Sequence, residues 1–185
     1  MAEATSTAAS GAQRAFDIRE ALVPLSGLGR LSLRGGPEVM AVAGHAFGVT
    51  LPMQACRSTE GDMRAALWLG PDEQLLLVQQ SEWAQALSAL QSALAPLPHS
   101  LVDISQRQLA LQVSGACAVE LLGAGCPLDL HPTAFPVGMC TRTLFAKAPI
   151  VLWRTAADSF HVEVWRSYAL YVQHLLRLIG QEFEA

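Results

Sequence analysis

Residues 31–52 read LSLRGGPEVMAVAGHAFGVTLP, and residues 109–130 read LALQVSGACAVELLGAGCPLDL. Both stretches begin with a Leu-x-Leu strand pattern, pass a glycine, continue as an apolar helical segment and reach a proline, Pro52 or Pro127. Self-similarity within one chain is the signature of a structural repeat. The sequence therefore predicts two halves with similar element order.

Each of these stretches is followed by a predicted β-hairpin. Residues 64–78 (RAALWLGPDEQLLLV) and 148–164 (APIVLWRTAADSFHVEV) both carry Leu-Trp, a polar turn and a second apolar strand. Apolar runs separated by turn residues are typical of hairpins. Residues 101–104 (LVDI) add a strand that closes the first half.

An amphipathic helix is expected after each hairpin. In 166–180 (RSYALYVQHLLRLIG), the spacing of the apolar residues predicts one buried face, at positions 168, 171, 172, 175, 176 and 179. Gly180 is expected to stop this helix in a left-handed turn. Ser81 is a candidate cap for a helix over 81–95, and Pro37 suits the first turn of a helix over 37–48.

Each half thus follows the split β-α-β pattern of ferredoxin-like units. We expect an α+β fold of two tandem ferredoxin-like units, with antiparallel sheet and stacked helices, in which the units can share or exchange edge strands. Residues 25–180 are predicted to form one compact domain with halves of about 25–104 and 105–180. The first sixteen residues are small and polar. Residues 1–24 are predicted to be a disordered or loosely ordered N-terminal tail, and residues 181–185 a C-terminal tail.

The composition excludes several classes of protein. Charged residues make up 15% of the chain and hydrophobic residues 51%, against about 25% charged in typical soluble domains. Either part of the surface is buried against another protein, or the host proteome is rich in Ala and Leu.

The net charge of −4 without a basic block argues against nucleic-acid binding. No apolar run approaches the ~20 residues of a membrane span, and no signal peptide is visible. We expect a cytoplasmic protein whose four cysteines are thiols.

Candidate chemistry is sparse. Cys126, His131 and Cys140 lie within CPLDLHPTAFPVGMC (126–140), but no two are close enough in sequence for a zinc-ligand pair. No nucleotide-binding loop or nucleophile motif is present. We expect no catalytic residue, metal or cofactor on this chain, and interpret 126–140 as a shaped docking loop.

Two short polar motifs are also open to a structural interpretation. His161 and Glu163 alternate on one strand face and are expected to face solvent. Asp103 and Ser105 are more typical of a turn than of a ligand site, because their side chains bond nearby backbone N–H groups.

Arginine is favoured at protein interfaces because its planar guanidinium pairs with carboxylates through two hydrogen bonds. The second half is otherwise sparse in charge. The predicted interface residues are therefore Arg142, Arg154 and Arg166, together with His131 and Phe135 of the docking loop.

Several segments together resemble the gamma subunit of heterotetrameric sarcosine oxidase. The similarity is best over residues 100–180, and the Asp-Ile-Ser at 103–105 fits it. The segments that carry it are GCPLDLHPTAFPVGMCTRTLF (125–145), VLWR (151–154), F-x-V-x-V (160–164) and RSYALYVQHLL (166–176).

The resemblance implies a complex of four different subunits that oxidises sarcosine to glycine, passes electrons through flavins to oxygen and yields hydrogen peroxide. With tetrahydrofolate the one-carbon unit leaves as methylenetetrahydrofolate. FAD, FMN, NAD and tetrahydrofolate are expected on partner subunits, with this chain docked on the alpha subunit and the beta and delta subunits completing the complex. The family fold is similar to the folate-binding domain of the glycine-cleavage T-protein and of tRNA-modification GTPases.

The resemblance supplies no catalytic residue. The leading hypothesis is a non-catalytic structural subunit that buries apolar and Arg-bearing surface on its partner. The alternative is a folate-type one-carbon binding module, which would use the cleft between the two halves with Asp103 and Arg142 as its first candidate residues.

Overall fold

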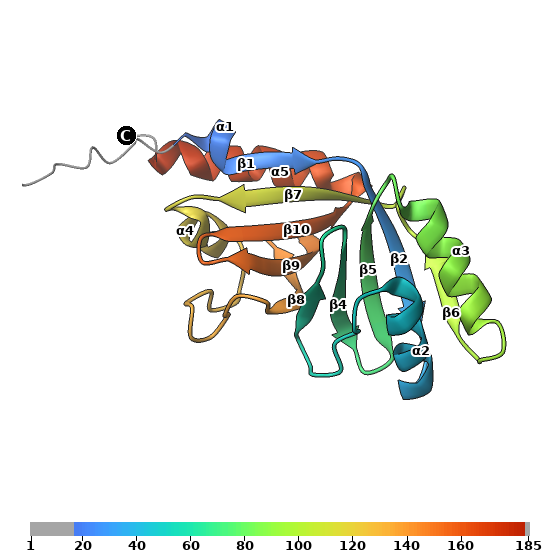
Figure 1. Ribbon diagram of the computed structural model, residues 1–185. Helices are drawn as coiled ribbons and strands as arrows, with labels where there is room; N and C mark the ends of the chain where they lie inside the picture. Colours follow the sequence, from blue (N-terminus) through green and yellow to red (C-terminus); the bar gives the residue numbers. More distant parts are fainter. Residues whose placement is uncertain (1–16, 184–185) are drawn as a thin grey trace, which may run out of the picture.

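The computed structural model describes residues 17–183, which form two five-stranded antiparallel sheets with helices on their outer faces (Figure 1). The first sheet has the order β3-β4-β5-β2-β6, and the second has the order β1-β7-β10-β9-β8. The strands are β1 (Leu22–Leu25), β2 (Leu28–Arg34), β3 (Ser58–Glu60), β4 (Arg64–Gly70), β5 (Glu73–Gln79), β6 (Ser100–Asp103), β7 (Gln108–Ser114), β8 (Cys140–Phe145), β9 (Ala148–Ala156) and β10 (Ser159–Trp165). The helices are α1 (Ile18–Ala21), α2 (Pro37–Phe47), α3 (Trp83–Leu94), α4 (Ala118–Gly123), α5 (Arg166–Gly180) and the short 3-10 helix η1 (Gln181–Phe183).

The first sheet is a ferredoxin-like unit. Its elements run β2-α2-β4-β5-α3-β6, with β3 added beside β4. The inner strand β2 pairs with β5 on one side and with β6 on the other, where Leu31 lies opposite Asp103. The α+β class, the two hairpins and the closing strand near 101–104 are confirmed.

The second sheet repeats this order, but its closing strand comes from the other end of the chain. β1 pairs with β7, with Leu22 opposite Val113. The two units therefore exchange a strand, because β1 precedes the first half in sequence and completes the sheet of the second (Figure 1).

The predicted terminal tails are longer than the structure allows. α1 and the first three residues of β1 lie within the predicted tail of residues 1–24. Asp17 caps α1 by accepting a hydrogen bond from the Arg19 N–H at 2.8 Å. At the other end, Gln181–Phe183 form the 3-10 helix. The remainder of both predicted tails, 1–16 and 184–185, lies outside the described residues.

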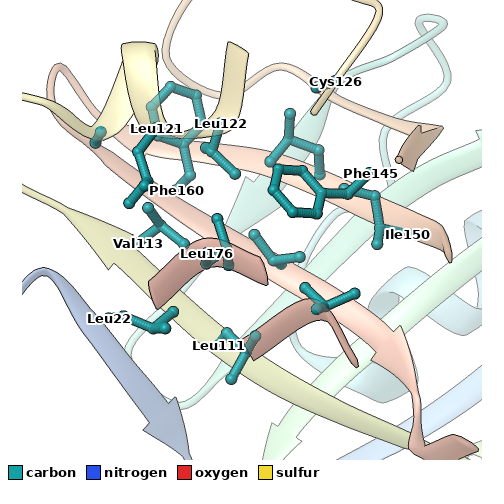
Figure 2. Close-up of a cluster of buried hydrophobic side chains, with 14 of the residues drawn as sticks. Leu22, Leu111, Val113, Leu121, Leu122, Cys126, Phe145, Ile150, Phe160 and Leu176 are labelled. Carbon is teal, nitrogen blue, oxygen red and sulfur yellow. The ribbon is translucent and has the colours of Figure 1, made fainter. Parts of the chain in front are cut away.

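Separate apolar cores lie between each sheet and its helices. In the second sheet, Leu111, Phe160 and Leu176 belong to the cluster beneath α4 and α5 (Figure 2). In the first sheet, side chains of β2, β4 and β5 pack beneath α2 and α3. α2 ends at Gly48, whose φ of 76° places it in the left-handed region that glycine occupies without a steric penalty. α3 starts at Trp83 without a side-chain cap, so the expected Ser81 cap is absent.

The bounds predicted for the last helix match α5, but its faces and its end differ from expectation. Ala169, Val172 and Leu176 are buried against the second sheet, whereas Tyr168 and Tyr171 are 36% and 40% exposed. The apolar residues of α5 extend around more of the helix than the sheet covers, so the two tyrosines stay partly exposed to solvent. Within residues 17–183, no helix is both long and apolar enough to cross a membrane.

Gly180 does not end α5 in a left-handed turn, since its φ is not positive. Its role is close packing, because a Cβ at this position would lie 2.6 Å from Cδ1 and 2.7 Å from Cγ1 of Ile18. We expect Gly180→Ala to lower the free energy of unfolding by about 1–3 kcal/mol through overpacking. Urea unfolding of Gly180→Ala, Ile18→Ala and the double variant checks this. The two effects must be clearly non-additive, and additive effects would contradict the contact.

Candidate functional site

The inner faces of the two sheets meet in a layer that contains both apolar and charged side chains. Side chains alternate along each strand, so every second residue of β4, β5, β8 and β9 points inward. The apolar part of this layer consists of Ala65, Leu67, Leu75, Leu77, Ile104, Cys140, Val151 and Trp153. Burial raises the pKa of the Cys140 thiol to about 12, so this cysteine is a protonated core residue.

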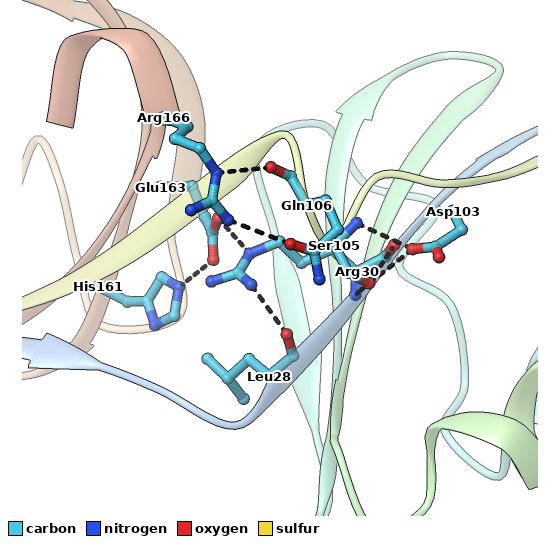
Figure 3. Close-up of polar contacts among 8 residues, drawn as sticks. All are labelled: Leu28, Arg30, Asp103, Ser105, Gln106, His161, Glu163 and Arg166. Atoms are coloured by element: carbon cyan, nitrogen blue, oxygen red, sulfur yellow. Dashed lines mark hydrogen bonds and ion pairs between the residues drawn. The ribbon is translucent and has the colours of Figure 1, made fainter.

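A buried ion pair joins the two sheets at one place in this layer. Arg30 of β2 donates from Nε to Glu163 Oε2 of β10 at 2.6 Å, and the two side chains are 4% and 0% exposed. His161 Nε2 lies 2.8 Å from the other Glu163 oxygen (Figure 3). The expectation that His161 and Glu163 face solvent is wrong, because the first sheet covers the strand face on which they lie.

Hydrogen bonds to the segment after β6 and to a carbonyl of β2 fix the position of Arg30. The Arg30 backbone N–H donates to Ser105 Oγ at 2.8 Å, and its Nη1 donates to the Leu28 carbonyl at 2.9 Å. Asp103 Oδ1 accepts from the Ser105 backbone N–H at 2.9 Å and from its hydroxyl at 2.6 Å (Figure 3). Asp103 and Ser105 therefore form the turn that the sequence favoured.

A second charged group joins the sheets nearer the surface. Glu73 of β5 is bonded by both Nη atoms of Arg142 of β8, with Nη1–Oε2 at 3.0 Å, and by Arg34 of β2 at 2.5 Å. Glu73 is largely buried, while the two arginines are half-exposed. The hydrogen bond from Arg142, together with the positive charges of Arg142, Arg34 and Arg107, lowers the pKa of Glu73 below its ordinary value of 4.5 despite its burial.

The lowered pKa of Glu73 predicts a pH-dependent contribution to stability. A carboxylate with a lowered pKa stabilises the fold above its unfolded pKa, and this stabilisation is lost as the pH falls through the folded pKa. We expect Glu73→Gln to be less stable than the parent at pH 7, with the difference shrinking below pH 4.5. Urea unfolding of both proteins between pH 7 and pH 3 measures it. A difference that stays constant over this range would contradict the assignment.

A pocket of about 380 Å³ opens beside this second group, between the two sheets. Arg142 lines it and Asp103 does not. Arg142 and Asp103 were the two residues predicted for a cleft between the halves. Arg142 lies at the pocket, whereas Asp103 forms the turn with Ser105.

Two predicted interface residues lie inside the chain. Arg154 is 2% exposed and donates to the carbonyls of Leu130, Phe135 and Ala157, with its guanidinium 5.0 Å from the Phe160 ring centroid. Phe135 is 1% exposed in the core of the second sheet. These side chains shape the loop of 126–139 from within and offer no surface to a partner.

The other predicted interface residues are accessible. His131 is exposed and its Nδ1 lies 2.8 Å from Thr133 Oγ1, and Arg166 is exposed while its Nε donates to the Gln106 carbonyl at 2.8 Å. Cys126 lies in the core of the second sheet and Cys140 between the sheets. Over residues 17–183, no three His, Cys, Asp or Glu side chains are arranged to hold a metal ion.

Comparison with known proteins identifies relatives of the whole fold. The chain is 35% identical over 187 residues to sarcosine oxidase subunit gamma from Corynebacterium sp. (strain U-96), covering 100% of this chain and 89% of the relative. It is also 35% identical over 176 residues to sarcosine oxidase subunit gamma from Arthrobacter sp., covering 86% and 83%.

Solved structures agree with these relatives. A chain of the heterotetrameric sarcosine oxidase from Corynebacterium sp. U-96, in complex with pyrrole 2-carboxylate, superposes with a TM-score of 0.83 at 34% identity, covering 89% of this chain and 85% of that chain. The glycine cleavage system aminomethyltransferase T from Bartonella henselae has a TM-score of 0.66 at 12% identity, covering 84% of this chain and 44% of that chain, and shows a shared fold. The model of the sarcosine oxidase gamma subunit family matches residues 34–182. This chain therefore belongs to the sarcosine oxidase gamma subunit family.

Proposed function

We propose that this chain is a non-catalytic structural subunit of a cytoplasmic heterotetrameric sarcosine oxidase and docks on the alpha subunit. The complex would oxidise sarcosine to glycine with release of hydrogen peroxide, and would form methylenetetrahydrofolate when tetrahydrofolate is present. The flavins, NAD and tetrahydrofolate would be held by partner subunits. Membership of the gamma subunit family supports the assembly.

The observation that carries the docking proposal is the outer side of α5. Tyr168, Tyr171 and Leu178 lie on one side of this helix, and they are 36%, 40% and 53% exposed, respectively. We call these three residues the α5 stripe. Exposed tyrosine and leucine at helical spacing suit a partner surface, because aromatic side chains are enriched at protein interfaces.

The inter-sheet layer supports a structural role. Its buried acid, Glu163, is bonded by Arg30 and His161, and Glu73 is bonded by two arginines. Charged groups that satisfy one another in this way rigidify the contact between the two sheets.

Co-purification with the partner subunits tests the docking. We expect the double variant Tyr171→Ser, Leu178→Ser to be recovered with the tagged alpha subunit in much lower yield than the parent, with an unchanged circular dichroism spectrum. Leu170→Ser is the matched control, since Leu170 is 81% exposed on the same helix but lies off the stripe. Unchanged recovery of the double variant would contradict docking through α5.

Kinetics of the assembled complex tests the non-catalytic role. Complexes that contain the variant chain and do assemble are expected to keep the parental kcat for sarcosine. A lower kcat per assembled complex would contradict a non-catalytic role for this chain.

Folate binding in the cleft, the alternative from the sequence, has weaker support. The likeness to aminomethyltransferase T shows fold alone. Asp103, one of its two candidate residues, is bonded to Ser105 and does not line the pocket.

A further inference from the structure

Two cysteines lie opposite one another where the two units meet. Arg57, just before β3, forms an isolated antiparallel bridge with Met139, just before β8. At the next position in this register Cys56 lies opposite Cys140, whose backbone N–H donates to the Cys56 carbonyl at 3.0 Å. Hydrogen-bonded residues that face each other in this way have Cα atoms about 5.5 Å apart. Cysteines in disulfides have Cα atoms about 4.4–6.8 Å apart, so the two backbones have the separation that a disulfide needs.

The sulfur of Cys140 lies beside the segment that carries Cys56. Cys140 is fully buried, and its Sγ lies 3.3 Å from the carbonyl oxygen of Arg57, the residue that follows Cys56. Burial and, to a smaller extent, the charge of the nearby Cys56 raise the pKa of the Cys140 thiol to about 12. The two thiols are therefore close enough to interact, although Cys140 alone is unreactive because it stays protonated.

Cys56 is the accessible member of the pair. It is half-buried in a turn, and the two residues before it, Gln54 and Ala55, are exposed. Its φ of 59° lies in the left-handed region, which is sterically unfavourable for a residue that has a Cβ. Glycine would adopt this conformation freely, so a cysteine here keeps the turn under backbone strain. Residues held under such strain cluster at functional sites.

We propose that Cys56 and Cys140 are a peroxide-sensitive thiol pair that closes to a disulfide between the first and the second unit. The Cys56 thiolate attacks one oxygen of hydrogen peroxide, the O–O bond breaks, and Cys56 becomes a sulfenic acid. The released hydroxide takes up the proton that Cys56 gave to the solvent.

Cys140 completes the reaction as the resolving thiol. It loses its proton, its sulfur attacks the sulfenic sulfur of Cys56, and the S–O bond breaks. The hydroxide that leaves takes up the proton from Cys140. Two thiols are thus oxidised to one disulfide, and one hydrogen peroxide is reduced to two waters. The bond joins the segment before β3 to the first residue of β8 and so ties the two sheets together covalently.

The proposed function supplies a source for the oxidant, since the complex would release hydrogen peroxide. The chemistry of the pair does not rest on that assignment, because peroxide from any source would drive it. Added peroxide therefore tests the pair itself, and turnover of sarcosine tests the supply.

Peptide mapping of the full-length chain tests the pair. The chain is treated with a small excess of hydrogen peroxide, its remaining thiols are alkylated under denaturing conditions, and it is digested with trypsin and Asp-N without reduction. Cys56 then lies in peptide 35–57 and Cys140 in peptide 129–142, each as the sole cysteine of its peptide. We expect a linked species that is lighter than the sum of the two peptides by two hydrogens and that disappears on treatment with dithiothreitol.

Variants assign the roles of the two thiols. Cys56→Ser is expected to abolish the link, whereas Cys140→Ala is expected to leave Cys56 as a sulfenic acid that dimedone labels. Cys117→Ser is the matched control, since Cys117 is also half-buried but lies at the start of α4, and it is expected to form the link as the parent does. Absence of the linked peptides, an equal yield of links to Cys117, or oxidation of Cys56 to the sulfinic acid without a link overturns the proposal.

The same mapping on the assembled complex during turnover of sarcosine separates the pair from its oxidant. We expect the Cys56–Cys140 link to appear and catalase to suppress it. A link with added peroxide but none during turnover would overturn the supply of peroxide by the complex and leave the thiol pair standing.

Discussion

Glu163→Gln is expected to lower the free energy of unfolding by about 3–5 kcal/mol, the range observed when one partner of a buried ion pair is removed. Arg30 is 4% exposed, so its guanidinium would stay in the protein interior without a counter-charge. The neutral amide has nearly the same size as the carboxylate, which excludes a cavity as the cause. The effect would act between the sheets, because Arg30 and Glu163 belong to different ones.

Urea unfolding followed by tryptophan fluorescence measures this loss. The double variant Arg30→Met, Glu163→Leu serves as the control, since apolar replacement of both partners of a buried pair is often neutral or stabilising. We expect it to be clearly more stable than Glu163→Gln. A single variant within about 1 kcal/mol of the parent would show that the pair does not hold the sheets together.

Arg154→Ala is expected to cost about 3–5 kcal/mol, since unbonded buried carbonyls cost about 1–3 kcal/mol each. Arg154 is the buried donor to the carbonyls of Leu130 and Phe135, at 3.0 and 2.9 Å. The loop between α4 and β8 would lose its internal anchor. We expect increased proteolysis within 126–139 in addition to the lower free energy of unfolding.

Arg166→Ala is the matched control for this variant. Arg166 also donates to backbone and side-chain oxygens, both on Gln106, but it lies on the exposed surface. Its removal is expected to cost less than about 1 kcal/mol. Equal losses in the two variants would contradict the role of Arg154 as a buried anchor.

Local patterns in the sequence predicted the elements of this fold well. The repeat around Leu31 and Leu109 marked the first strand of each unit, and apolar spacing gave the bounds of α5. Exchange of an edge strand was predicted as a possibility of tandem units. Its source was missed, because β1 is only four residues long and its partner lies far along the chain.

The charged inter-sheet layer could not be predicted in the same way. The alternation of His161 and Glu163 with apolar residues indicates two strand faces but does not tell whether the polar face meets water or a second sheet. Arg30 and Glu163 are 133 residues apart, and neither has a local signal that identifies its partner. One available clue was that β10 and its neighbours carry few polar residues for a half-exposed sheet.

Side-chain direction accounts for the other differences. Arg154 and Phe135 lie in a family-like segment, and residue type alone favoured an interface for both. The structure turns both inward, where Arg154 bonds the carbonyl of Phe135. In α5 the apolar spacing gave the helix, but only the width of the sheet decides which apolar residues it covers.

The exchanged strand also sets the order of events on the ribosome. β1 emerges first during synthesis, but its partner β7 and the rest of the second sheet are made only after the whole first unit. Domains generally fold from the N-terminus as they are made, so the first unit can form while β1 waits unpaired. Dividing the chain between β6 and β7 would not give two complete units. The N-terminal fragment would contain β1, which is the edge strand of the second sheet. Although the two halves repeat the same order of elements, they therefore cannot be separated into two independently folding domains.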